Sequence, residues 1–220
     1  MMTRRRRTRG LARSHATREP RRRLLIVCEG KITEPKYLAA LRYEHKNRLV
    51  DIEFVPDGGV PKTLVEYAVE RKRGADKEAR RTRDSFYKYD EVWCVFDVDE
   101  HPRLAEAKQQ ATDNGLILAI SNPCFELWLL LHFRDQTAEL SRAEAQRACR
   151  DYIPGYQKTV PSDRVSPLYS EAVRRAVALD NWQKTRDNVG GNPSSGIYHL
   201  TERVRELGRD AFLRPTLAYP

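Results

Sequence analysis

The chain has 220 residues and a formal net charge of +9, with 40 Lys and Arg side chains against 31 Asp and Glu. This length suits a single domain that can bury a core without disulfide bonds. No run of about 18 apolar residues occurs, so we expect no membrane-spanning helix. The four cysteines lack the spacing of zinc ligands and follow no signal peptide, which predicts reduced, buried thiols and a cytoplasmic protein.

The positive charge is concentrated at the start of the chain. Residues 1–23 hold ten arginines and one acid, whereas the remaining residues carry equal numbers of basic and acidic side chains. We expect a disordered Arg-rich tail over residues 1–21, of a kind that attracts phosphate backbones without reading their sequence. A solvated leader with no target and an organellar transit peptide are the alternatives.

Strand and helix patterns alternate after this tail. Residues 24–28 form an apolar run that is too short for a helix and is bounded by Gly30, so we expect a strand. A helix should follow, capped by Thr33, with Pro35 in its first turn, where the missing N–H costs little. A second strand is predicted over residues 50–55.

The middle of the chain continues this alternation. Residues 63–72 predict a helix, and the mostly charged stretch 71–90 predicts an exposed extension or loop, whose basic residues form either a solvated face or part of a nucleic-acid track. A third strand is expected over residues 91–96. A helix over residues 103–114 should follow it, with Gly115 at its C-terminal cap.

A fourth strand is predicted over residues 116–120. The strongly apolar stretch 123–133 is expected to be a buried helix, although its length also permits a strand. Further helices are expected over residues 141–150, 167–187 and 195–207. Strands that alternate with helices imply a parallel sheet with right-handed crossovers.

We therefore expect an α/β fold with a Rossmann-like parallel sheet of about four strands flanked by helices. Its organisation should have three parts. Residues 1–21 form the basic tail, residues 22–135 form the α/β core, and residues 136–220 form a helical extension packed on that core.

Acidic residues follow two of the predicted strands. Glu29 ends the first strand, with Glu34 soon after it, and Asp97 and Asp99 end the third. The carboxyl ends of parallel strands meet at one edge of a sheet, and Asp97 and Asp99 point to the same side of an extended chain, about 7 Å apart. Carboxylates this close repel unless a cation or proton lies between them, and Mg²⁺ can fill that role while binding phosphate oxygens. The alternative is that these acids only cap the helices that follow.

These motifs resemble those of known families. An apolar strand that ends in Glu-Gly, with a later one that ends in Asp-x-Asp, resembles the signature of Toprim domains, which occur in topoisomerases, primases and the overcoming-lysogenization-defect nucleases. Over most of the chain, from about residue 22 to 210, the sequence resembles RloB-like proteins. The stretches that carry this resemblance are residues 26–35, 96–101, 121–133 and 192–195.

The resemblance implies a Toprim-like fold and a role for each acid. Glu29 matches the Toprim glutamate, an acid/base or metal ligand. Asp97 and Asp99 match the metal-binding pair, and Glu34 matches a second acid of the RloB-like opening. Glu126 is in the right setting for an additional metal-site acid. The implied cofactor is Mg²⁺ or Mn²⁺, and the implied catalytic residues are Glu29, Glu34, Asp97 and Asp99.

The activity implied by the resemblance is metal-dependent cleavage of DNA or RNA. RloB-like genes often accompany an ABC-type ATPase in defence loci, so the resemblance also implies an effector of phage defence with such a partner. A topoisomerase would need a nucleophilic tyrosine domain and a longer chain. Two alternatives remain: a non-catalytic nucleic-acid-binding or regulatory subunit, and a haloacid-dehalogenase-type phosphatase with Asp97 as nucleophile, although that motif normally ends the first strand of its domain.

Two further features are candidates for binding a phosphate. Lys31 follows Glu29 in a turn, and is equally well explained as a solvated lysine. The stretch 190–196 is rich in Gly and Ser but lacks the Gly-Lys-Ser/Thr of a nucleotide-binding loop, so we interpret it as the start of the last helix.

Overall fold

The fold is built on a five-stranded sheet with the strand order β2-β1-β3-β4-β5. The computed structural model describes residues 22–56, 59–98 and 103–212, and for residues 209–212 it describes the backbone only. The first four strands along the chain are mutually parallel, and the fifth pairs antiparallel with β4. The strands are β1 (Leu24–Cys28), β2 (Val50–Phe54), β3 (Glu91–Asp97), β4 (Ile117–Asn122) and β5 (Ser194–Ser195). The predicted α/β, Rossmann-like class is thereby confirmed.

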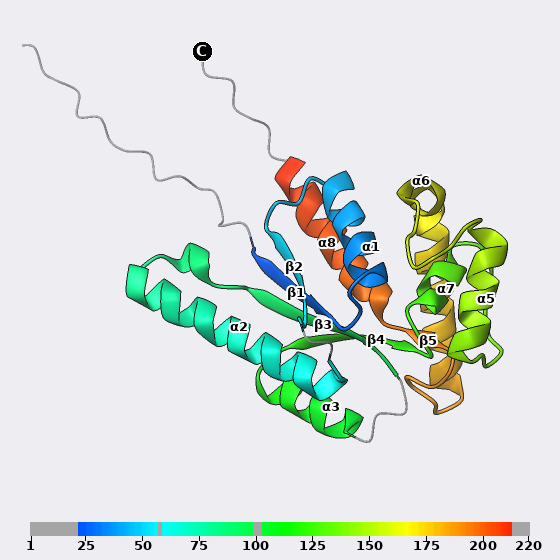
Figure 1. The fold of residues 1–220 in the computed structure, drawn as a ribbon, viewed down its shortest axis with the longest axis horizontal. Coiled ribbons are helices and arrows are strands. Elements are labelled where there is room, and N and C mark those ends of the chain that lie inside the picture. The colour runs from blue at the N-terminus through cyan, green and yellow to red at the C-terminus, as the bar shows by residue number, and fades with distance from the viewer. Residues whose placement is uncertain (1–21, 57–58, 99–102, 213–220) are drawn as a thin grey trace, which may run out of the picture.

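Helices cover both faces of this sheet (Figure 1). They are α1 (Thr33–Glu44), α2 (Pro61–Thr82), α3 (Leu104–Asp113), α4 (Glu126–Leu131), α5 (Arg142–Tyr152), α6 (Ser162–Val165), α7 (Tyr169–Thr185) and α8 (Ile197–Phe212). Short 3₁₀ turns occur at Ser85–Tyr87 and Ser166–Leu168. None of the described helices is both long and apolar enough to cross a membrane.

The two faces of the sheet bury separate cores, because successive side chains of a strand point to opposite sides. Leu25 and Val27 of β1 pack with Val92 of β3 against α2 and α3. Leu24 and Ile26 face the other way, into a larger cluster that α1, α4, α7 and α8 complete. Both faces of β1 and β3 are therefore apolar, which explains why these strands read as unbroken hydrophobic runs.

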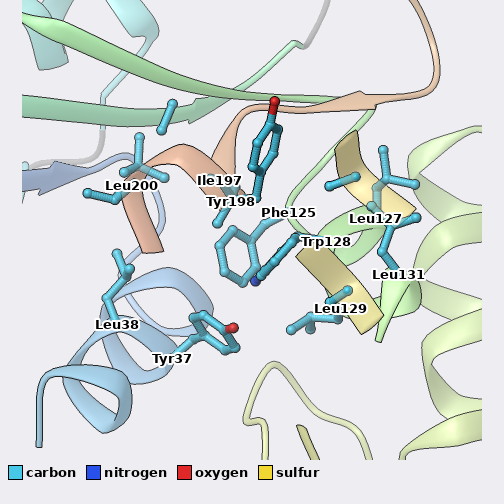
Figure 2. Close-up of a cluster of buried hydrophobic side chains, with 14 of the residues drawn as sticks. Tyr37, Leu38, Phe125, Leu127, Trp128, Leu129, Leu131, Ile197, Tyr198 and Leu200 are labelled. Atoms are coloured by element: carbon cyan, nitrogen blue, oxygen red, sulfur yellow. The ribbon is translucent and has the colours of Figure 1, made fainter. Parts of the chain in front are cut away.

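The larger cluster is centred on α4, whose residues are all buried. Tyr37 of α1 meets Trp128 of α4 edge to face, with ring centroids 6.4 Å apart. Figure 2 shows these rings together with Leu127, Leu131 and the side chains that α8 contributes, including Leu200. A buried helix is present within the predicted range 123–133, although it is shorter, Glu126–Leu131, and the strand alternative is wrong.

Several expectations need correction. The second helix does not end at residue 72 but continues to Thr82. Its second half lacks an apolar stripe, but consists largely of strong helix formers without proline, and Arg83 ends it in the left-handed region at φ 55°. Thr33 is the first helical residue rather than the cap, which is Ile32. The expected tail, residues 1–21, lies outside the described residues.

The C-terminal region is mostly helical, but residues 194–195 add the short strand β5 to the sheet. Ser195 pairs with Ser121, and Gly196 N–H donates to the carbonyl of Ile120 at 2.8 Å. The glycine-rich stretch before it does lead into α8, although through a strand. All four cysteines are free and buried, as the sequence predicts.

Candidate functional site

The carboxyl ends of β1 and β3 lie side by side and bring Glu29 to Asp97. Glu29 continues the ladder beyond β1, because its N–H donates to the carbonyl of Val95 at 2.9 Å. Its Oε2 accepts a hydrogen bond of 3.1 Å from the backbone N–H of Asp97. Two acids that are 68 residues apart in the sequence thus adjoin at one edge of the sheet.

Glu34 reaches this edge from the first turn of α1, where it is only 7% exposed. Its carboxylate folds back over Gly30. A Cβ built on Gly30 would lie 2.6 Å from the carboxyl carbon of Glu34 and closer still to Oε2. The Glu-Gly pair therefore has a local physical reason, since the missing side chain of Gly30 leaves the space that the Glu34 carboxylate fills.

Asp97, the last residue of β3, is 8% exposed and forms an ion pair with Arg142 of α5. The guanidinium Nη2 donates to Oδ2 of Asp97 at 3.0 Å. Asp99, the second member of the predicted pair, lies outside the described residues.

Glu126 starts α4 and is 5% exposed. Its Oε1 accepts a hydrogen bond of 3.0 Å from the hydroxyl of Tyr156, which follows α5. This bond gives a partner to one oxygen of a carboxylate that burial would otherwise strip of water.

One pocket of about 350 Å³ gathers these acids. Glu29, Glu34, Asp97 and Glu126 line it together with three cationic residues, Lys31, Arg142 and Lys158. Lys31 also donates to the carbonyl of Pro56 at 2.7 Å. The structure thus brings together every predicted site acid that it describes, and adds basic residues from the C-terminal region.

Burial and the charges of the pocket raise the pKa of two of its carboxyl groups. Burial is the main reason that the pKa of Asp97 is well above its usual range, with repulsion from Glu34, Glu126 and Glu29 added and the attraction of Arg142 opposing. Burial and the same kind of repulsion raise the pKa of Glu34, which Lys158 partly offsets. The site therefore favours a bound proton or a cation.

The donor chemistry of the pocket fits Mg²⁺ or Mn²⁺, because hard cations prefer carboxylate oxygens and these carboxylates repel one another. Within the described ranges, however, no group of three or more His, Cys, Asp or Glu side chains is close enough to hold a metal ion as it stands. The ligand set expected at Glu29, Asp97, Asp99 and Glu126 therefore stays a prediction, of which the structure describes three members.

Sequence reasoning missed Arg142, Tyr156 and Lys158, since all three lie beyond the predicted α/β core. One signal was available for Arg142. Ser141 and Glu144 form a capping box that fixes the start of α5, so Arg142 stands at the first helical position. A cation there opposes the helix dipole, which indicates a partner outside the helix.

Comparison with known proteins identifies the family. No curated protein and no solved structure matches the chain at a significant level. The model of the RloB-like protein family matches residues 24–204, which include every acid of the pocket as well as Arg142 and Lys158. This match covers most of the chain and extends from β1 into α8, and the protein accordingly belongs to the RloB-like family.

Proposed function

We propose that this protein is a Mg²⁺- or Mn²⁺-dependent nuclease of the Toprim type, which hydrolyses phosphodiester bonds of DNA or RNA. The observation that carries the proposal is the junction of Glu29 with Asp97 at the ends of two adjacent parallel strands, inside a pocket that Glu34 and Glu126 also line. Ligand sites of open parallel sheets lie at this edge.

In this proposal Asp97, Glu29 and Glu126 would hold the metal ion, with Asp99 as the further ligand that the sequence resemblance implies. Bound there, the ion would polarise the scissile phosphate and lower the pKa of water. Glu29 also adjoins the reacting centre and can move a proton to or from it. The raised pKa of Glu34 lets its carboxyl keep a proton closer to neutral pH, which suits a second proton carrier.

The biological setting follows from the family alone. An RloB-like nuclease in a defence locus would act as an effector against phage, with an ABC-type ATPase as its partner. The ten arginines of residues 1–23 would add salt-sensitive affinity for a nucleic-acid backbone.

The test is cleavage by purified full-length protein. The protein is incubated with Mg²⁺ or Mn²⁺ and plasmid DNA, single-stranded DNA or tRNA, beside the variants Asp97→Ala and Glu29→Ala. Both variants should lose cleavage, while Glu139→Ala, an exposed acid outside the pocket, should retain it. Circular dichroism and thermal unfolding report whether each variant is folded. Unchanged cleavage in a folded Asp97→Ala protein refutes the mechanism.

A non-catalytic nucleic-acid-binding subunit is the second candidate. It is favoured by the concentration of positive charge in residues 1–23. Deletion of residues 1–21 separates the two. A nuclease should still cleave at low salt, whereas a subunit that binds through its tail should lose its binding and show no cleavage at any salt concentration.

A further inference from the structure

Arg142 occupies a position that helix stability does not explain. The capping box of Ser141 and Glu144 is sufficient to start α5, and a cation at the first helical position is unfavourable beside the positive end of the helix dipole. The side chain nevertheless points to the pocket, where its guanidinium pairs with Asp97 at 3.0 Å while remaining 43% exposed. The Arg142 side chain thus contacts a site acid and is also partly open to solvent.

Lys158 lines the same pocket and has a left-handed backbone conformation. Its φ of 61° lies in the left-handed region, which is unfavourable for a non-glycine residue. The chain is fixed on both sides of it. Tyr156 bonds to the buried Glu126, and the hydroxyl of Thr159 accepts a hydrogen bond of 3.2 Å from Lys36. Such strain persists where the surroundings impose it, and often marks a functional position.

The acids of the pocket and two of its three cationic residues come from different parts of the chain; the third cation, Lys31, follows Glu29. The acids of the pocket stand at the ends of β1 and β3 and at the starts of α1 and α4, whereas Arg142 and Lys158 come from α5 and the loop after it. A phosphodiester that approaches a cation held by the acids needs partners for its remaining oxygens. The planar guanidinium of arginine presents paired donors that match two phosphate oxygens, and lysine supplies a compact charge.

We propose that Arg142 and Lys158 form the subsite that binds a backbone phosphate of the nucleic acid, and that Arg142 exchanges Asp97 for this phosphate when a divalent cation binds Asp97. This inference rests on the proposed function. The exchange follows from charge balance. A divalent cation at Asp97 satisfies the carboxylate and repels the guanidinium. The incoming phosphate then replaces the Asp97 carboxylate as a negatively charged partner of the guanidinium.

An Arg142 that exchanges partners and an Arg142 that only holds α5 against the sheet lead to different expected affinities. If Arg142 only tied α5 to the sheet, its removal would loosen the pocket and weaken the binding of both metal ion and nucleic acid. If Arg142 exchanges partners, its removal frees Asp97 from a competing cation and takes away a phosphate contact. Metal binding should then tighten while nucleic-acid binding weakens.

The experiment measures the two affinities separately in the full-length protein. Mn²⁺ binding is measured by calorimetry without nucleic acid, and binding of a phosphorothioate single-stranded oligonucleotide is measured by fluorescence anisotropy in Ca²⁺. The variants are Arg142→Gln, Arg142→Lys and Lys158→Gln. The matched control is Arg147→Gln, an exposed arginine of α5 that does not line the pocket.

Arg142→Gln should bind Mn²⁺ up to about fivefold more tightly, the range of a partly exposed ion pair. It should bind the oligonucleotide about tenfold or more weakly, as expected for a lost hydrogen bond to a charged group. The slope of log affinity against log salt concentration should decrease by about one unit. Arg142→Lys should recover part of the oligonucleotide affinity. Lys158→Gln should weaken oligonucleotide binding without tightening Mn²⁺ binding, and the control should behave as wild type.

The inference is overturned if Arg142→Gln weakens the binding of both Mn²⁺ and the oligonucleotide, or if it leaves both affinities unchanged. It is also overturned if the wild type binds no Mn²⁺. Because neither measurement needs turnover, the outcome is independent of cleavage. A protein that cleaves but whose Arg142 variants bind as wild type would retain the proposed function and refute the subsite. Opposite shifts in a protein that cleaves nothing would support the subsite and refute the nuclease.

Discussion

The substitution Gly30→Ala tests whether the position of the Glu34 carboxylate matters. The new Cβ would lie 2.6 Å from the carboxyl carbon of Glu34, whereas ordinary contact begins at 3.4 Å. The carboxyl carbon must therefore retreat by at least about 0.8 Å, and Oε2, which is nearer, by more. Rotation of a flexible side chain away from its preferred angle costs about 0.5–1.5 kcal/mol, so the midpoint of thermal unfolding should fall by only a few degrees, at about 2–4 °C per kcal/mol.

The expected loss of activity is much larger than this loss of stability. A displacement of about 1 Å at a reacting group can lower a rate by roughly 100-fold. The assay compares cleavage at saturating metal ion with thermal unfolding of the same samples. Gly74→Ala is the matched control, since a Cβ at this α2 position meets nothing within 4 Å. It should add about 0.5–1 kcal/mol of stability and leave cleavage unchanged.

A double variant identifies the cause of the loss. If Gly30→Ala acts by moving the Glu34 carboxylate, adding it to Glu34→Ala should cause no further loss, because the two changes then affect one group. Full cleavage by the single Gly30→Ala variant would refute the reasoning, and so would a further large loss in the double variant.

Two other predictions concern stability. Tyr156→Phe leaves a buried oxygen of Glu126 without its donor, which should cost about 1.5–3 kcal/mol, whereas Tyr43→Phe should have no effect because Tyr43 is 86% exposed; equal unfolding midpoints would contradict this. The raised pKa of Asp97 means that the native metal-free protein binds this proton more tightly than the unfolded chain. The favourable contribution of this proton to the free energy of unfolding should therefore be fully present below the pKa of an unfolded aspartate and be lost as the pH rises through the raised pKa. Burial lowers the pKa of His132 to about 4, so His132 changes the stability in the opposite direction. Because the Asp97→Asn variant also contains His132, this effect cancels when the unfolding free energy of the variant is subtracted from that of the wild type. The difference should move in favour of the wild type at lower pH; a constant difference would contradict this.

The central strands β1 and β3 could be predicted well because they are buried on both faces. The apolar run of β1 is followed by Glu29 and that of β3 lies between Glu91 and Asp97, so charged residues mark the ends of both strands within a residue. Parallel strand ends meet at one edge, which was enough to expect that Glu29 and Asp97 would lie together. Their direct hydrogen bond depends on register, which the sequence does not specify.

The missed features depend on contacts rather than on local pattern. The second half of α2 is stabilised by helix propensity and pairs such as Arg81 with Glu78, so apolar periodicity did not reveal it. The strand β5 has two residues and is defined by its pairing with β4. Arg142 and Lys158 enter the pocket through tertiary packing of α5 and its loop, which no sequence spacing predicts.

The division of the pocket between two parts of the chain has a consequence for biosynthesis. The ribosome completes Glu29, Asp97 and Glu126 before it reaches Arg142 and Lys158. A nascent chain, or a fragment that stops before α5, thus carries the carboxylates and Lys31 but neither Arg142 nor Lys158. The nuclease proposed above would in this way lack its proposed phosphate-binding residues during most of its synthesis.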